Sequence, residues 1–275
     1  MRHADSFFTI GRGHEVCQDY ARSRSDEDGV HVALADGCSG SPDTDFGARF
    51  LVMAAEAHQQ DFNVTRIFRH AENAAWCTPG LRESALDATL ITLSSEDGGV
   101  TARVVGDGVV AARLRDGRIE AWRVRFEPCK TGQVAAGYGS YLLHPDRMDA
   151  YVAAGANVRV VERYIDGELV GTETTSCRKD DPASFIHTLH FPVGDVDFVA
   201  AFSDGVESFD AEVVEGSKVR EPVTLHAVLR EVMAVKGGTG KFVQRRCQRF
   251  LRDHCVKHRW QHHDDFSMIA VWCAP

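Results

Sequence analysis

The sequence lacks the features that mark secreted, membrane-spanning and disulfide-bonded proteins. No stretch approaches the roughly 18 consecutive apolar residues that a membrane helix needs. The opening residues, MRHADSFFTI, contain no apolar core of the signal-peptide kind, so we expect no secretory leader. The 8 cysteines are scattered and form no CxxC pair, which argues against both a disulfide framework and a zinc ribbon. We therefore expect reduced thiols and a cytoplasmic protein without a membrane partner.

Positive charge is scarce as well. The chain has 31 Lys and Arg residues against 40 Asp and Glu residues, a formal net charge of −9 at pH 7. This balance argues against nucleic acid as a partner. No internal repeat and no Pro/Ser-rich linker divides the 275 residues, which suffice for one large core. We expect a single domain over residues 1–275, in which the polar, glycine-rich residues 129–181 form an insertion or loop region.

Short apolar runs of strand length recur along the chain, most of them bounded by Gly or Asp. Residues 88–124 predict an antiparallel meander, because EDGG and RDGR contain the Asp-Gly pairs of tight hairpin turns. Residues 46–59, 224–235 and 242–259 have apolar side chains at helical spacing. Strands with inserted helices favour an α+β fold over a doubly wound sheet. The predicted strands are 30–35, 88–93, 100–105, 109–114, 119–124, 198–202 and 266–272.

Aspartates stand at the ends of apolar strands, where a carboxylate is poorly hydrated. Asp36, Asp107 and Asp204 each follow an apolar run and precede a glycine, in VALADG, ARVVGDG and AAFSDG. Asp264 stands just before the run FSMIAVW, and Asp19 lies near the start in CQDY. Buried carboxylates repel one another unless a hard divalent cation lies between them. Each Asp-Gly pair alone is ordinary turn chemistry, but the set indicates a divalent-metal site.

In their order along the chain, these motifs resemble those of the metal-dependent (PPM, type-2C) serine/threonine protein phosphatases. The opening motif is closest to a divergent bacterial branch that begins Gly-x-x-His. The resemblance implies a four-layer α-β-β-α sandwich of two mainly antiparallel sheets flanked by helices, with residues 129–181 beside the active-site cleft. The segments that carry it are GRGHEVCQDYA, VALADGCSGSPDTDFGAR, ATLITL with RVVGDGVVAARLRDGRI, FVAAFSDGVESF and HDDFSMIAV.

The resemblance also implies a reaction and its ligands. Two cations, Mn²⁺ or Mg²⁺, would hold the hydroxide that attacks phosphoserine or phosphothreonine in a protein, the product of a Ser/Thr kinase. Asp36 would bridge both ions, and Gly37 would offer its carbonyl. The implied catalytic and metal-binding aspartates are Asp19, Asp36, Asp204 and Asp264, with Asp107 at a third, weaker site.

Two positions depart from the family pattern. Many members have a phosphate-clamping arginine five residues before the aspartate equivalent to Asp19, where this chain has His14 and, two residues further back, Arg12. We expect Arg12 or His14 to bind the phosphate, with a structural role for His14 an equal alternative. Cys38 stands where some members have a proton-donating histidine, so no general acid is evident.

Other interpretations stay open from the sequence. A catalytically weak or inactive relative that serves as a regulatory or binding module would explain the missing arginine. A dimetal hydrolase of small phosphoesters would use the same aspartates. His254, His258 and His262 recur every four residues, and we interpret them as one solvated helix face rather than as a zinc site.

Overall fold

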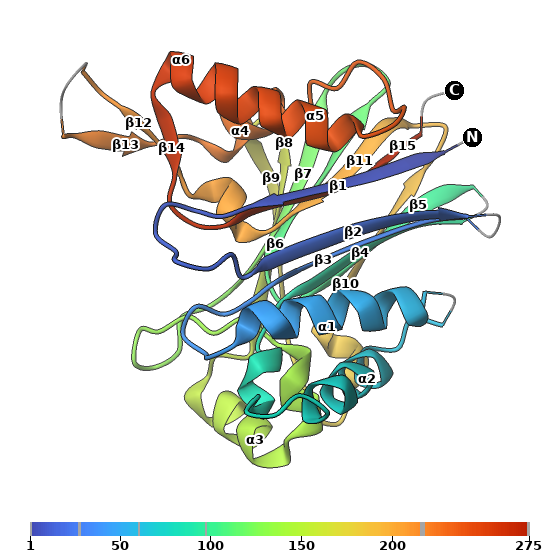
Figure 1. Cartoon of the computed structure of the whole chain (residues 1–275), viewed down its shortest axis with the longest axis vertical. Coiled ribbons are helices and arrows are strands. Elements are labelled where there is room, and N and C mark those ends of the chain that lie inside the picture. Colours follow the sequence, from blue (N-terminus) through green and yellow to red (C-terminus); the bar gives the residue numbers. More distant parts are fainter. Residues whose placement is uncertain (1, 27–28, 60, 97, 215–217, 274–275) are drawn as a thin grey trace.

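The computed structural model describes residues 2–26, 29–59, 61–96, 98–214 and 218–273. Two antiparallel sheets pack face to face, and helices cover the outer side of each (Figure 1). The predicted four-layer α-β-β-α sandwich is therefore confirmed. No helix in the described part of the chain is both long and apolar enough to cross a membrane.

The larger sheet has seven strands in the order β1-β15-β11-β6-β7-β8-β9. Its centre, β11 and β15, is buried almost completely, because the runs VDFVAAF and FSMIAVW are apolar on both faces. Its strands are β1 (His3–Thr9), β6 (Gly108–Leu114), β7 (Ile119–Phe126), β8 (Val158–Ile165), β9 (Glu168–Ser176), β11 (Val196–Phe202) and β15 (Phe266–Trp272).

The smaller sheet has five strands in the order β10-β5-β4-β3-β2. A separate small sheet, β13-β12-β14, was not expected, because its strands are too short to give an apolar pattern. The bounds are β2 (Asp19–Asp26), β3 (Gly29–Asp36), β4 (Leu90–Glu96), β5 (Gly99–Val105) and β10 (Ile186–Pro192), with β12 (Phe209–Glu212), β13 (Arg220–Pro222) and β14 (Trp260–His262).

The alternation of side chains along β3 shows how the layers form. Val32 and Leu34 lie in the core between the two sheets, together with residues of β6, β11 and β15. Ala33 and Ala35 point the other way and pack under the helices of the adjacent layer. Because successive side chains of a strand point to opposite faces, one apolar strand contributes to two cores.

Two helices cover the smaller sheet. The first, α1 (Thr44–Ala57), corresponds to the predicted helix 46–59, and the second, α2 (Val64–Trp76), was not predicted. The side chain of Asn63 caps α2 by accepting a hydrogen bond from a backbone N–H of the first turn. Gly47 lets α1 approach its neighbours, since a Cβ atom there would lie only 1.6 Å from the carbonyl oxygen of Ala85.

On the larger sheet, the predicted helices 224–235 and 242–259 are present with shorter bounds. The second one ends at His258, and Arg259 turns the chain into β14 with φ of 54°. His262 therefore lies in a strand, and the expectation of one helix face with three histidines is wrong for this residue. The elements are α4 (Leu225–Val232), α5 (Phe242–Arg249), a π-helical turn (Phe250–Cys255) and α6 (Val256–His258).

Residues 129–181 contain more regular structure than a loop region would. They include a 3-10 turn (Gly139–Leu143), α3 (Pro145–Ala154) and the strands β8 and β9, which extend the larger sheet. The residues of β9 are exposed along their whole length. A fully exposed strand has no buried face, so its sequence, ELVGTETTS, carries no alternation from which a strand could be predicted.

Gly47→Ala is expected to lower the free energy of unfolding by about 1–3 kcal/mol, because the added methyl overlaps the Ala85 carbonyl in a packed interior. An open helix position would instead gain stability from the same change. Urea unfolding followed by circular dichroism measures the difference. Gly171→Ala in β9, where a Cβ atom meets open space, is the control. Equal or greater stability of Gly47→Ala would show that α1 does not pack this closely.

Candidate functional site

Five aspartates converge at one end of the sandwich, where strands of both sheets stop. Asp19 begins β2 and Asp36 ends β3, and the two are paired in register. Asp107 lies in the turn that carries the chain from β5 in one sheet to β6 in the other, a turn with positive φ at both flanking glycines. Asp204 follows β11, and Asp264 stands just before β15. We call these five residues the acidic cluster.

The carboxylates of the acidic cluster lie close enough to change one another's pKa. Burial, together with the charge of Asp204, raises the pKa of Asp19 to about 7 and that of Asp107 to about 8. Burial and the charges of Asp19 and Asp204 raise the pKa of Asp36 well above its usual value. The neighbouring carboxyl groups of Asp36 and Asp204 also shift each other's pKa. The structure therefore brings together carboxyl groups that cannot all be ionised without a counter-charge.

The counter-charge does not come from basic side chains of the described residues. No lysine or arginine among them forms an ion pair with the acidic cluster, and His14 pairs only with its outermost member, Asp264. The side chain of Asp19 is 1% exposed, and its Oδ1 atom is buried without a hydrogen-bond partner in the described part of the chain. Its Oδ2 atom accepts a hydrogen bond from Ser203 Oγ at 2.7 Å.

This donor set fits hard divalent cations, which bind carboxylate oxygens and remove the repulsion between them. In the described residues, no three Asp, Glu, His or Cys side chains are already arranged around a single ion position. Gly37 lies directly beside the cluster, where the lack of a side chain is required: a Cβ atom would come within 2.7 Å of Thr44.

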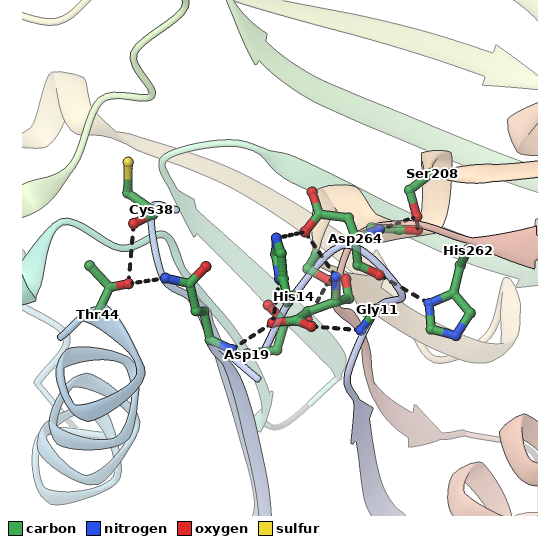
Figure 2. A network of polar contacts seen from close by, with 12 residues as sticks. Gly11, His14, Asp19, Cys38, Thr44, Ser208, His262 and Asp264 are labelled. Atoms are coloured by element: carbon green, nitrogen blue, oxygen red, sulfur yellow. Dashed lines mark hydrogen bonds and ion pairs between the residues drawn. The ribbon is translucent and has the colours of Figure 1, made fainter. Parts of the chain in front are cut away.

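His14 lies against the acids and not in open solvent (Figure 2). Its Nε2 atom is 3.4 Å from Asp264 Oδ1, and its Nδ1 atom is 3.1 Å from Asp265 Oδ2. Burial lowers the pKa of His14, but the hydrogen bond and charge of Asp265 outweigh it, so the pKa is raised overall. The imidazolium form is thus favoured, which suits a residue that holds Asp264 in place.

Asp265 is the second aspartate of the HDDFSMIAV segment and takes the position at which the family resemblance has an asparagine. It is 2% exposed and accepts hydrogen bonds from the backbone N–H groups of Gly11, at 2.7 Å, and Gln18, at 2.5 Å. These contacts fasten the segment 11–18 to the start of β15. The sequence indicates this role only weakly, because an Asp-Asp pair before a strand does not show which of the two carboxylates accepts the backbone hydrogen bonds.

Arg12 has a different environment from His14. Its side chain is exposed and forms no hydrogen bond or ion pair with any described residue. Its backbone N–H donates to the carbonyl of His262 at 3.3 Å, which holds the main chain of the opening segment in position. Of the two residues expected to meet phosphate, Arg12 is the one with its charge free to do so.

The opposite side of the cluster is formed by part of residues 129–181, the segment expected beside the active-site cleft. The Tyr138 hydroxyl lies near Cys38, Asp36 and Asp107; burial, followed by the charge of Asp107, raises its pKa. Arg147 holds this region by an ion pair with Asp87, at 2.6 Å. No local motif marks Tyr138, because its position depends on the packing of a distant segment.

Glu207 completes the surroundings of the acidic cluster. It ends the 3-10 turn that begins at Asp204, and its Oε2 atom accepts a hydrogen bond from Arg123 Nε at 2.9 Å. Burial raises the pKa of Glu207, and the Asp204 carboxylate adds to the effect. The ion pair thus connects the cluster to the outer face of β7.

Comparison with known proteins agrees with this geometry. Residues 10–131 match the family description "Protein phosphatase 2C". No curated protein matches the sequence. A bacterial serine phosphatase aligns with 98% of this chain and 97% of its own, at 12% identity and a TM-score of 0.54. Serine/threonine phosphatase Stp1 from Staphylococcus aureus aligns with 99% of this chain and 95% of its own, at 11% identity and a TM-score of 0.54.

The serine/threonine phosphatase PstP/Ppp from Mycobacterium tuberculosis aligns with 100% of this chain and 99% of its own, at 12% identity and a TM-score of 0.50. These similarities show a shared fold that extends beyond the segment matched by the family description. They confirm the resemblance read from the sequence: residues 10–131 match protein phosphatase 2C, and the whole chain shares the fold of bacterial serine/threonine phosphatases.

Proposed function

We propose that this chain is a metal-dependent protein phosphatase that hydrolyses phosphoserine and phosphothreonine, with one catalytic domain over residues 1–275. The observation that carries the proposal is the acidic cluster: five carboxylates from both sheets meet at one end of the fold, without lysine or arginine partners among the described residues. The match to the phosphatase family and the shared fold support it.

Two bound cations, Mn²⁺ or Mg²⁺, would supply an activated water and neutralise the charge of the phosphoryl group. Asp36 would be a ligand to both ions, which is supported by its position near Asp19 on the neighbouring strand and Asp204 on the other sheet. Asp264 would hold one ion from the outer side, with Gly37 offering its carbonyl. Asp107, near Asp204, would contribute to a third and weaker site.

The remaining residues would position the substrate. Arg12 would bind the phosphate through its free guanidinium, and His14 would orient Asp264 rather than contact phosphate. Residues 129–181 would shape access to the site, as Tyr138 beside Cys38 suggests. All 8 cysteines are free thiols, which supports a reducing compartment such as the cytoplasm.

Asp36→Asn and Asp204→Asn are each expected to reduce Mn²⁺-dependent hydrolysis of a phosphoserine peptide by roughly a thousandfold, since losing a metal ligand removes several kcal/mol of transition-state stabilisation. Phosphate release measures the rate. Asp116→Asn, which changes an exposed Asp-Gly turn, is the matched control and should retain full activity. Turnover that survives in either cluster variant, or in EDTA, would refute the metal mechanism. Turnover of p-nitrophenyl phosphate alone would favour small phosphoesters over proteins.

The metal-free protein is expected to lose stability as the pH rises from 5 to 8.5. Asp19 and Asp107 have folded-state pKa values of about 7 and 8, above the unfolded value near 3.9, so the folded state binds more protons over this range. Stability that is present below pH 4 is then lost through pH 7–8. Thermal unfolding in EDTA tests this expectation.

Saturating Mn²⁺ should raise the melting temperature at pH 8 by about 5–10 °C, and by less at pH 5, where protons compete for the same oxygens. The variant Asp107→Asn should show a weaker pH dependence without metal. A melting temperature that climbs with pH in EDTA would contradict the description of the cluster.

Arg12→Ala and His14→Ala are expected to distinguish phosphate binding by Arg12 from positioning of Asp264 by His14. Loss of a charged hydrogen bond to phosphate costs about 1.5–3 kcal/mol, so Arg12→Ala should raise KM roughly tenfold or more at saturating Mn²⁺. His14→Ala should instead raise the Mn²⁺ concentration needed for half-maximal activity. Steady-state kinetics at varied peptide and Mn²⁺ concentrations distinguish them, and the reverse pattern would assign the phosphate to His14.

A further inference from the structure

A cavity outside the acidic cluster has no role in the proposed reaction. It has a volume of about 460 Å³ and lies between β7, β8 and the start of α4. Pockets of this size commonly bind small ligands or side chains. Its apolar wall consists of Ile119 and Ala121 from β7 and Leu225 and Leu229 from α4.

The polar lining of the cavity is mainly acidic. Asp166 and Glu168 lie in the turn between β8 and β9, and Glu207 lies at the inner end. Glu168 is exposed, and its carboxylate has no hydrogen bond or ion pair with the described residues. Asp166 accepts a hydrogen bond from the backbone N–H of Ile119 at 2.9 Å, and its charge acts on Arg118 outside the cavity lining.

The arginine in the cavity does not offset this charge. Arg123 donates to Glu207, and its Nη1 atom lies 3.3 Å from Glu162 Oε2, so two carboxylates already occupy it. His226 is the other basic group in the lining. An anionic ligand would be repelled by Glu168, whereas a cation would find this carboxylate without a partner among the described residues.

The cavity is close to the site of phosphate hydrolysis. Glu207, which lines it, ends the 3-10 turn that starts at Asp204. At about 2 Å per residue, three residues of such a turn span roughly 6 Å. An extended peptide advances about 3.3 Å per residue, so a substrate with its phosphoserine at the cluster reaches the Glu207 end of the cavity within about two residues. Asp166 and Glu168 lie farther along the sheet, because Ile165 pairs with Glu120, which pairs with Ala112, whereas Asp107 precedes Gly108. At roughly 20 Å from Asp107, they are within reach of a long side chain about five residues from the phosphoserine.

We propose that this cavity binds a lysine or arginine side chain of the phosphoprotein substrate, a few residues from the phosphorylated position. The aliphatic stem packs on the apolar wall, and the charged head meets Glu168 and Asp166 at the rim. Long basic side chains are suited to such a site, because they bury their methylene groups while the head group keeps its polar contacts. This inference rests on the proposed phosphatase function and adds a substrate preference to it.

The test uses a series of phosphoserine peptides in which all other positions are alanine except one arginine. The position of this arginine varies across the series, from five residues before the phosphoserine to five residues after it. The kcat/KM value is measured with Mn²⁺ for the full-length protein. One arginine position should raise kcat/KM by about 3- to 10-fold over the all-alanine peptide, the range of one or two exposed charge pairs.

Glu168→Lys should abolish this preference and favour glutamate at the same position, while hydrolysis of p-nitrophenyl phosphate stays unchanged. Glu173→Lys, which makes the same charge change five residues along the exposed strand β9 and outside the cavity lining, is the matched control and should keep the preference. A wild-type protein that hydrolyses all peptides equally would overturn the proposal. So would a preference that persists in Glu168→Lys.

Binding of the same peptides, measured by fluorescence anisotropy, separates this proposal from the proposed function. If no phosphopeptide is hydrolysed but the arginine peptide binds more tightly and Glu168→Lys removes the difference, the phosphatase function fails and the cavity assignment stands. If peptides are hydrolysed but arginine affects neither the rate nor the binding, the phosphatase function stands and the cavity assignment fails. If neither hydrolysis nor an arginine-dependent difference in binding is found, both fail.

Discussion

The repulsion among buried carboxylates is the constraint on which the site depends. The strands that end at the acidic cluster belong to two different sheets, and their apolar interiors fix where the carboxyl groups lie. Hydrophobic packing therefore holds in place an arrangement that electrostatics alone would disperse. Without a cation, proton binding can relieve the repulsion, because burial and the charge of Asp204 raise the pKa of Asp19 to about 7 and that of Asp107 to about 8.

The fold itself therefore favours cation binding at the acidic cluster. The core between the sheets is continuous from β3 through β11 to β15, so the carboxyl groups cannot separate without disturbing it. A protein interior resists this because it is closely packed. A cation that binds these carboxylates is attracted by all of them, and its binding requires no free energy to bring them together because the fold already does so.

Much of this could be predicted from the sequence, for identifiable reasons. The runs that form β11 and β15 are apolar throughout, and the Asp-Gly pairs mark where strands end, so the positions of Asp36 and Asp204 follow from local pattern. The strand β9 was missed because an exposed strand gives no apolar alternation. The helix α2 was missed although its buried residues stand at helical spacing behind the Asn63 cap, so its pattern was present in the sequence. Tyr138 and Glu207 acquire their places only through tertiary packing.

The hairpin turn that carries Asp166 and Glu168 joins two strands at the edge of the larger sheet, and β9 is exposed along its length. Substitutions at such an edge cost little folding stability, whereas substitutions in the acidic cluster change both charge balance and packing. Related chains can therefore diverge in the turn while the chemical centre stays the same. Under the proposed role of this turn, the choice of substrate would change independently of the chemistry at the acidic cluster.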